Sequence, residues 1–336
     1  MTIARALGAA DVANYPFPFP RDSYRYSTNV EPSGPRNATA AGGWGERRIV
    51  LDDHLHHELD ERAAILRRDP SRSQCLPHMA AATWDAMITI MRDLAADHPE
   101  SMTLDRFADR DRVYRWQNAL LGIDDTFTLG DPDSLPAPPL DYICGQIQED
   151  VILLDQRDGQ LWADAGVVTF AADWSFGFDV GMSFLEIHGP VPRVHSEKII
   201  TRAHDFLMRL EPGQSYRRTN WTLTVDGRLD TSTETYPEWG RDRRTLADGP
   251  LAGVGRRLFL RTEVQHLVRL RQSSAVMFLI RTYLLPFSAV ATVPEWADRL
   301  YRVLEDLPLD MADYKGITRT RPAGMRWLST FGGVVP

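Results

Sequence analysis

The spacing of apolar residues changes along the chain, and each spacing predicts a different kind of element. Over residues 52–68 and 83–96, apolar residues recur every three or four positions, which is typical of helices with one buried face. The same spacing predicts helices over 196–210 and 295–307. Helices are therefore expected early in the chain, in its middle and near its C-terminus.

Five other segments are apolar in short runs or in alternation, which is typical of strands. The strand candidates, in chain order, are 151–154, 161–170, 220–225, 258–270 and 275–285. The first two flank a turn at 157–159 and predict a hairpin, and the last two are separated only by the short segment 271–274. Together with the helices, they predict an α+β fold with an antiparallel sheet.

Prolines indicate where the chain divides. Residues 130–140 contain four prolines, too many for a helix or a central strand. Residues 15–20, YPFPFP, predict an extended arm, and the interleaved Phe17 and Phe19 predict that it packs on the body of the protein. We expect an N-terminal arm with helices (1–140), a core (141–290) and a C-terminal helix with a tail (291–336), forming one compact unit.

Composition excludes several classes of function. The 336 residues carry 38 Lys and Arg against 46 Asp and Glu, a formal net charge of −8. This excess of acidic residues argues against general electrostatic binding to nucleic acid or to an anionic membrane. The N-terminus lacks the apolar segment of a signal peptide, and no run of about 18 uncharged apolar residues occurs. A soluble, cytoplasmic protein is the expectation.

Several redox and nucleotide signatures are missing from the sequence. The two cysteines, Cys75 and Cys144, form no CxxC motif, so no iron–sulfur or thiolate zinc site is expected. GxGxxG, GxxxxGK[ST] and GxSxG are also absent. A redox enzyme built from this chain would need electrons from another protein.

Nine histidines make metal or haem ligation worth testing. His188 follows an apolar segment and precedes a turn stiffened by Pro190 and Pro192, which would fix its direction; a structural role and a ligand role are equally balanced. His195 and His204 are lesser candidates. A cluster of histidines also occurs at His54, His56 and His57 beside Glu58 and Glu61, but it lacks HExxH spacing, so a solvated helix face is favoured.

A strand with one polar face offers a second kind of chemistry. Arg261, Glu263, Gln265 and Arg269 alternate along 258–270 and so share a face of the predicted sheet. They form either a solvated ladder of weak salt bridges or a polar wall on which a carboxylate binds a cationic amine. Arginines on neighbouring strands, at 217, 218 and 281, similarly form surface pairs or bind an acidic group through bidentate contacts.

Several motifs in a fixed order resemble the haem-dependent oxidative N-demethylase family. The resemblance extends from about residue 15 to residue 328. The motifs are QEDVILL (148–154), Trp174 followed by Gly181, IHGPVP (187–192), RTNW (218–221), LRTEVQHLVRL (260–270), FLIRTY (278–283) and YKG (314–316).

The resemblance implies a PAS-like core, in which a five-stranded antiparallel sheet with a helical crossover encloses haem b. It implies an enzyme that uses O2 and takes electrons from NAD(P)H through flavin or iron–sulfur reductase proteins, and that converts a small secondary amine, dimethylamine, to methylamine and formaldehyde. By position, His188 is the expected iron ligand, with His195 as the alternative. Glu263 and Arg261 become polar residues of the active site, with Glu263 as the partner of a protonated amine, and Arg218 binds a propionate.

The chain departs from the family pattern at three positions. Asp179 stands where the family carries a lysine, Val264 replaces an arginine and Arg271 replaces a proline. Asp179 joins Glu263 and Arg261 as a candidate catalytic residue, because reversing a charge there would change substrate preference and proton supply. A different nitrogen-containing substrate, from secondary metabolism, and a non-catalytic haem gas sensor are the alternatives. Homo-oligomer formation is left open.

Overall fold

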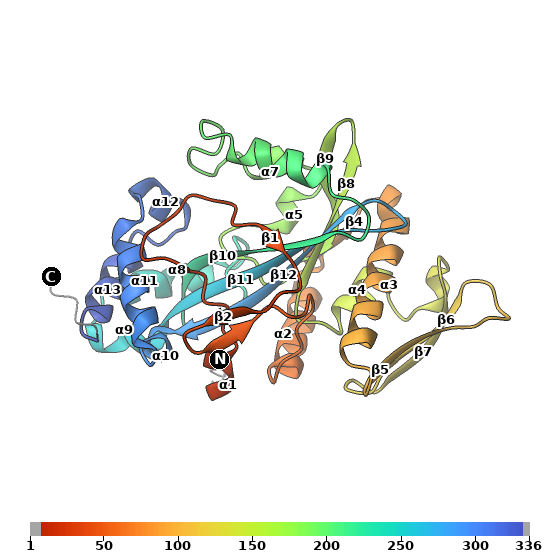
Figure 1. Cartoon of the computed structure of the whole chain (residues 1–336), viewed down its shortest axis with the longest axis horizontal. Helices are drawn as coiled ribbons and strands as arrows, with labels where there is room; N and C mark the ends of the chain where they lie inside the picture. Colours follow the sequence, from red (N-terminus) through yellow and green to blue (C-terminus); the bar gives the residue numbers. More distant parts are fainter. Residues whose placement is uncertain (1–7, 332–336) are drawn as a thin grey trace.

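The computed structural model describes residues 8–331 and is organised around one large antiparallel sheet (Figure 1). The strand order across this sheet is β1-β10-β11-β12-β8-β9-β4. Its five long strands are β8 (Asp150–Arg157), β9 (Gln160–Val167), β10 (Ser215–Val225), β11 (Leu258–Arg269) and β12 (Val276–Pro286), and the short edge strands are β1 (Glu31–Pro32) and β4 (Ser73–Cys75).

The expectation of a five-stranded sheet was wrong in number, since the sheet has seven strands. The two extra strands are two and three residues long, too short to give an apolar pattern. The predicted strand over 220–225 also begins earlier, at Ser215. Its first half contains Arg217 and Arg218, and such charged residues hide a strand from any reading based on apolar spacing.

The four predicted helices are present as α2 (Leu55–Arg68), α3 (Ala80–Asp97), α7 (Ile199–Met208) and α11 (Pro294–Asp306). The other α-helices are mostly short. They are α1 (Ala9–Ala13), α4 (Pro139–Cys144), α5 (Phe176–Asp179), α6 (Phe184–Ile187), α8 (Tyr236–Ala247), α9 (Val254–Arg257), α10 (Phe287–Val290), α12 (Leu309–Tyr314) and α13 (Thr320–Leu328). Short 3-10 turns occur at Pro70–Arg72, Pro77–Met79, Pro132–Ser134 and Leu251–Gly253.

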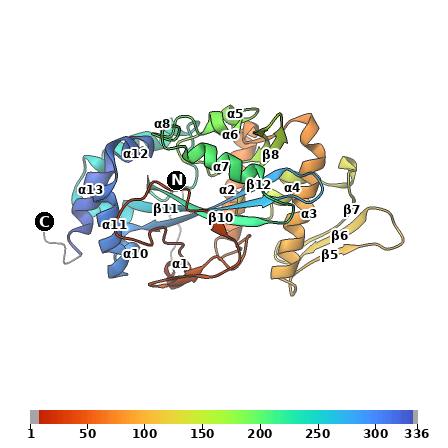
Figure 2. The same ribbon diagram turned by 45° about the horizontal axis from the view of Figure 1, so that its top comes forward.

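Both faces of the sheet are covered. Figure 2 shows α5, α6 and α7 over one face and the N-terminal hairpin of β2 (Asn37–Thr39) and β3 (Gly42–Trp44) under the other. The continuous apolar run of β8 follows from this double burial: Val151 and Leu153 join the core beneath α3, whereas Ile152 and Leu154 join the core beneath α7. We call the face under α5–α7 the α7 face.

A separate three-stranded antiparallel sheet lies at one end of the molecule (Figure 1). It consists of β5 (Met102–Arg106), β6 (Val113–Asn118) and β7 (Ile123–Thr128). Its strands are short and rich in polar residues, and the apolar pattern did not predict them. Trp116 on β6 is fully buried against α3 and anchors this sheet to the main body.

The N-terminal arm contacts the far end of the main sheet through aromatic side chains. The Tyr15 hydroxyl donates to the Leu260 carbonyl oxygen at 2.7 Å. The ring of Phe17 stacks on Trp296 of α11 with centroids 4.7 Å apart, and Phe19 meets Trp221 edge to face at 4.9 Å. These contacts bring residues from both ends of the chain onto strands β10 and β11.

Buried ion pairs fasten α2 to the sheet and explain the QEDVILL motif. Arg62 of α2 donates to the backbone carbonyls of Gln148 and Glu149 and forms an ion pair with Asp150 at 3.2 Å. Glu58, one turn earlier, pairs with Arg281 of β12 at 2.7 Å. These side chains are at most 1% exposed, so the motif serves to join helix and sheet. Within residues 8–331, no helix has the length and apolar character needed to cross a bilayer.

Candidate functional site

A row of polar side chains crosses the α7 face of the sheet. Antiparallel pairing places Arg218 opposite Gln265 and Asn220 opposite Glu263. Arg261 lies two residues from Glu263 on β11, with its side chain on the same face. Arg261 is 0% exposed, and Glu263 and Gln265 are each 6% exposed. These residues are therefore not a solvated surface ladder, and the polar wall is the alternative that their burial favours.

Glu263 is held by donors on three sides. Arg261 Nε lies 3.2 Å from Glu263 Oε1, while the amides of Gln265 and Asn220 donate to Oε2 at 3.0 and 3.3 Å. Arg261 is itself fixed, since its guanidinium also donates to the Leu229 carbonyl oxygen at 2.7 Å. A buried carboxylate needs such partners to remain charged. The arrangement holds the Glu263 carboxylate in one orientation.

Arg218 and Lys315 extend this polar row toward the edge of the sheet. Arg218 donates through Nε to the Thr28 carbonyl oxygen and through Nη1 to Gln265 Oε1, both at 2.9 Å. Lys315, which follows α12, donates to Asn220 Oδ1 at 3.4 Å. We refer to Arg218, Asn220, Arg261, Glu263, Gln265 and Lys315 as the polar row.

His188 caps the short helix α6 on the same face. A capping box between Ser183 and Glu186 starts this helix, and the proline-rich turn after His188 ends it. The Nδ1 atom of His188 lies 2.8 Å from the Phe184 carbonyl oxygen. A carbonyl oxygen accepts only, so Nδ1 carries the proton and Nε2 presents a lone pair. Burial, with a smaller contribution from the positive charge of Arg218, lowers the pKa of His188 to about 4 and keeps the imidazole neutral at physiological pH.

Phe184 packs against His188 and belongs to a group of apolar side chains that remain partly exposed. The Phe184 ring lies 4.3 Å from the His188 ring, centroid to centroid. The partly buried apolar residues packed on this core include Trp174, Val180, Phe184, Ile187, Phe206 and Phe278. A partly exposed aromatic ring beside a neutral imidazole is suited to a flat apolar ligand.

The other sequence-based candidates lie in different surroundings. His195 is exposed. Asp179 lies beside Glu234, and burial together with the charge of Glu234 raises its pKa to about 6. No hydrogen bond or ion pair within residues 8–331 joins Asp179 to Glu263. His204 is 8% exposed and its Nε2 atom is buried without a hydrogen-bond partner; its ring lies 6.3 Å from that of Phe184.

The histidines of α2 behave as a solvated helix face. His56 and His57 are exposed. His57 is 3.9 Å from Glu61, and His54 pairs with Asp11 at 2.7 Å. The helix therefore turns Glu58 and Arg62 inward and its histidines largely outward.

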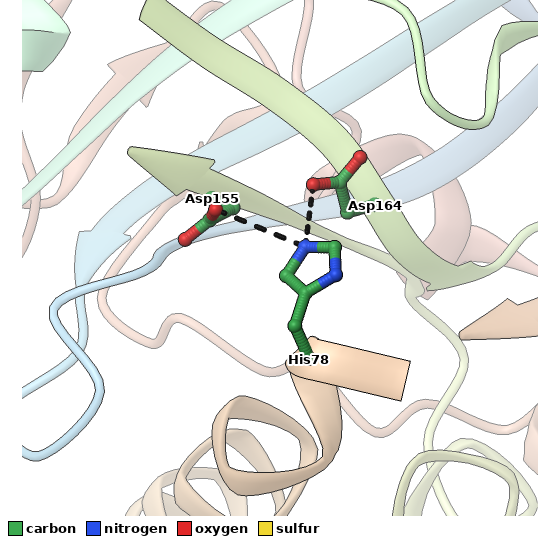
Figure 3. A group of neighbouring side chains, drawn as sticks. All are labelled: His78, Asp155 and Asp164. Carbon is green, nitrogen blue, oxygen red and sulfur yellow. Dashed lines mark hydrogen bonds and ion pairs between the residues drawn. The ribbon is translucent and has the colours of Figure 1, made fainter. Parts of the chain in front are cut away.

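A second polar cluster, which sequence reasoning missed, joins His78 to Asp155 and Asp164 on strands β8 and β9 (Figure 3). His78 Nε2 lies 2.9 Å from Asp164 and 3.8 Å from Asp155. Arg157 donates to both aspartates, at 2.8 Å for Asp155. Because the guanidinium supplies the positive charge between these carboxylates, the group is explained as an ion-pair cluster.

Sequence reasoning also missed Asn220 and Lys315. Both occur in quoted motifs, RTNW and YKG, but neither residue type signals chemistry alone. Lys315 is 95 residues from Asn220 along the chain, and only the fold brings them together. The one available signal was the scarcity of lysine, since Lys198 and Lys315 are the only lysines in the sequence.

Comparison with protein families identifies the family of this chain. A family model described as haem-dependent oxidative N-demethylase, alpha subunit-like, matches residues 42–325. The chain belongs to this family. The match covers most of the chain, including both His188 and the polar row, and the family's name associates it with haem and with oxidative removal of N-methyl groups.

The donor set around His188 suits haem b. A haem iron takes a neutral imidazole nitrogen, and His188 offers Nε2 with its tautomer set by the bond from Nδ1. The neighbouring aromatic and aliphatic residues suit the apolar macrocycle, and the cationic Arg218 suits an acidic propionate. The residues present therefore fit the group that the family name requires.

Proposed function

We propose that this protein is a haem-dependent oxidoreductase that uses O2 to demethylate a small amine. The observation that carries the proposal is His188, a neutral imidazole that lies beside the partly exposed ring of Phe184 and whose Nε2 has no hydrogen-bond partner among residues 8–331. We further propose that β8, β9, β10, β11 and β12 form a PAS-like core. Their spatial order in the sheet is β10-β11-β12-β8-β9, and along the chain the helices α5–α7 connect β9 to β10; both features support that assignment.

In this proposal each residue of the site has a distinct role. His188 holds haem b, and His195, exposed on the following loop, is the alternative ligand that mutagenesis must exclude. When bound, haem supplies the activation of O2. Glu263 binds the protonated amine through its remaining acceptor positions, Arg261 fixes that carboxylate, and Arg218 binds a propionate.

The overall reaction also defines the partners. Removing a methyl group from a secondary amine consumes O2, a pair of electrons and a pair of protons, and releases the primary amine, formaldehyde and water. The two cysteines are free and 69 positions apart in sequence, Cys75 exposed and Cys144 buried, which suits electron delivery from outside. We propose a flavin or iron–sulfur reductase that draws on NAD(P)H, located with this protein in the cytoplasm. The family's description as alpha subunit-like supports a multi-subunit enzyme.

Asp179 favours a second candidate substrate. Its side chain is partly buried next to Glu234, so the family's lysine is replaced by a pair of neighbouring acidic groups. The local charge is reversed, and this favours a nitrogen-containing substrate other than dimethylamine.

An absorption spectrum recorded during an amine titration tests the proposal. The full chain reconstituted with haem b is expected to show a Soret band, and dimethylamine or a related amine is expected to perturb it. With a reductase and NAD(P)H, formaldehyde release should follow amine addition. Absence of a Soret band would refute the haem assignment, whereas a Soret band with reversible gas binding and no turnover would indicate a sensor.

A further inference from the structure

Lysine is rare in this protein, and one of its two lysines lies in the polar row. Of the 38 basic residues, all except Lys198 and Lys315 are arginines. Lys198 is exposed at the start of α7. Lys315 is partly buried beside Asn220. The two residues therefore offer a matched pair, one at the site and one in solvent.

The segment around Lys315 lies along the edge of β10 at residues 220–222, beyond the part that pairs with β1, and these contacts fix Lys315. The Lys315 ammonium donates to the Trp221 carbonyl oxygen at 2.7 Å and lies 4.7 Å from the centre of the Trp221 ring. The Thr222 hydroxyl in turn donates to the Lys315 carbonyl oxygen at 3.0 Å. With Asn220 as its second acceptor, the ammonium retains one N–H that has no partner among residues 8–331.

Arg218 is fixed in a similar way and retains a free donor. Its Nε and Nη1 atoms donate to the Thr28 carbonyl oxygen and to Gln265, and no hydrogen bond of Nη2 occurs in the described part of the chain. Arg218 and Asn220 are two residues apart on β10, which corresponds to about 7 Å. Lys315, bound to Asn220, therefore lies close enough to Arg218 for one small ligand to reach both.

The charges of the polar row do not balance. It contains three cations, and its single carboxylate, Glu263, forms its ion pair with Arg261. Neither Arg218 nor Lys315 has an ion pair within residues 8–331. Burial lowers the pKa of both, and repulsion from Arg218 contributes to lowering that of Lys315 to about 8; the charge of Glu263, which Arg261 already pairs, opposes this only in part. Partly buried charges ordinarily have a counter-ion, so the site has a place for an anion.

We infer that Arg218 and Lys315 together bind a carboxylate group. A guanidinium presents parallel N–H donors that match a carboxylate, and an ammonium adds a compact charge from a second direction. The source of this carboxylate rests on the proposed function. It is either a propionate of haem b or an acidic group carried by the amine substrate. In the second case the substrate class is an N-methylated amino acid, with its amine at Glu263 and its carboxylate at this pair.

Ligand titrations of the full chain, purified without haem, distinguish a propionate from an acidic group of the substrate. The chain and its variants Lys315→Met, Lys315→Arg and Arg218→Gln are titrated with haem b and with haem b dimethyl ester, whose propionates are blocked. Lys198→Met is the matched control, and circular dichroism verifies folding; Arg218→Lys replaces Arg218→Gln if the latter fails to fold. The haem-loaded proteins are then titrated with N-methylglycine and with dimethylamine.

A propionate source predicts that Lys315→Met and Arg218→Gln weaken haem b binding by about tenfold or more, equal to about 1.4 kcal/mol, while the dimethyl ester binds all proteins equally. A substrate source predicts unchanged haem binding and about tenfold weaker N-methylglycine binding, with dimethylamine unaffected. Lys315→Arg should retain most binding in either case. Equal binding of every probe by wild type and variants would overturn the inference.

A readout without haem distinguishes failure of this inference from failure of the proposed function. In protein labelled with ¹³C-lysine there are only two lysine side chains to observe, and Lys198→Met assigns the signals. N-methylglycine or acetate added to the haem-free chain should shift the Lys315 signal and leave the Lys198 signal in place. If the wild type binds no haem but Lys315 responds, the proposed function fails alone. If Lys315 does not respond and haem binding is insensitive to Lys315→Met, the carboxylate site is refuted.

Discussion

His188 donates a hydrogen bond from Nδ1 to the backbone carbonyl oxygen of Phe184, at 2.8 Å. The two residues lie at opposite ends of the four-residue helix α6, so this bond fixes the imidazole within its own turn. It also determines which nitrogen is free to bind iron. A histidine that binds a metal usually donates its other nitrogen to such a partner, and the bond orients the ring.

Substitution of His188 tests its role as the iron ligand. We expect His188→Ala to abolish or strongly shift the Soret band, because the chain loses its neutral Nε2 donor, and we expect added imidazole to restore part of the signal. His195→Ala is the control, since His195 is exposed, and it should leave the spectrum intact. The reverse pattern would transfer the ligand role to His195.

Glu263→Gln tests the amine-binding carboxylate. The amide keeps the size of the side chain but removes its charge, so amine binding should weaken by about tenfold or more, equal to about 1.4 kcal/mol, while haem stays bound. The control is Glu100→Gln, which makes the same change at an exposed carboxylate outside the polar row. Kinetics and Soret titrations with the same amine provide the measurement. Unchanged KM and kcat in Glu263→Gln would rule out a substrate role for Glu263.

The buried pair between Arg281 and Glu58 should contribute strongly to stability. Both side chains are at most 1% exposed and lie 2.7 Å apart. Removing one partner leaves a buried charge, so Arg281→Met should lower the free energy of unfolding by about 3–5 kcal/mol in urea titrations. The exposed pair Arg36 and Glu46 is the control, and Arg36→Met should cost less than about 1 kcal/mol.

A double variant checks the reason for that loss. Arg281→Met combined with Glu58→Met removes both charges and should be less destabilised than the sum of the two single variants. Additive losses would indicate that the two side chains contribute separately, through packing, and that their charge interaction is minor.

His266 predicts an acid-dependent loss of stability. It is 2% exposed, and burial, with repulsion from Arg217 and Arg48, lowers its pKa to about 3. In the unfolded chain the pKa is about 6.5. As pH falls below about 6.5, the unfolded chain therefore binds a proton that the folded chain takes up only near pH 3. The free energy of unfolding should decline across this window and should be insensitive to His266 above it.

The variant His266→Gln isolates this contribution. It keeps a polar group near Ser33, whose hydroxyl lies 3.1 Å from His266 Nδ1, but cannot titrate. Urea unfolding at several pH values between 7 and 4 should show a smaller decrease for His266→Gln than for the wild type. Equal decreases would mean that other groups cause the acid sensitivity.

Local patterns in the sequence were sufficient for the main elements. The helical spacing of apolar residues predicted α2, α3, α7 and α11, because each of these helices buries one face. Alternation along β11 placed Arg261, Glu263 and Gln265 on one face, because side chains of a strand alternate between faces. The motif order, with no structural information, indicated the family that the comparison identifies.

Tertiary structure decided what surrounds those residues. Periodicity placed Glu263 on a polar face but did not show that this face is buried, which depends on α5–α7 covering the sheet. The bond that selects the tautomer of His188 depends on a four-residue helix, too short for a periodic signal. Lys315 reaches Asn220 from a segment 95 residues away. Burial, orientation and long-range contact arise from packing between elements, whereas a sequence pattern reports only which face of each element is apolar.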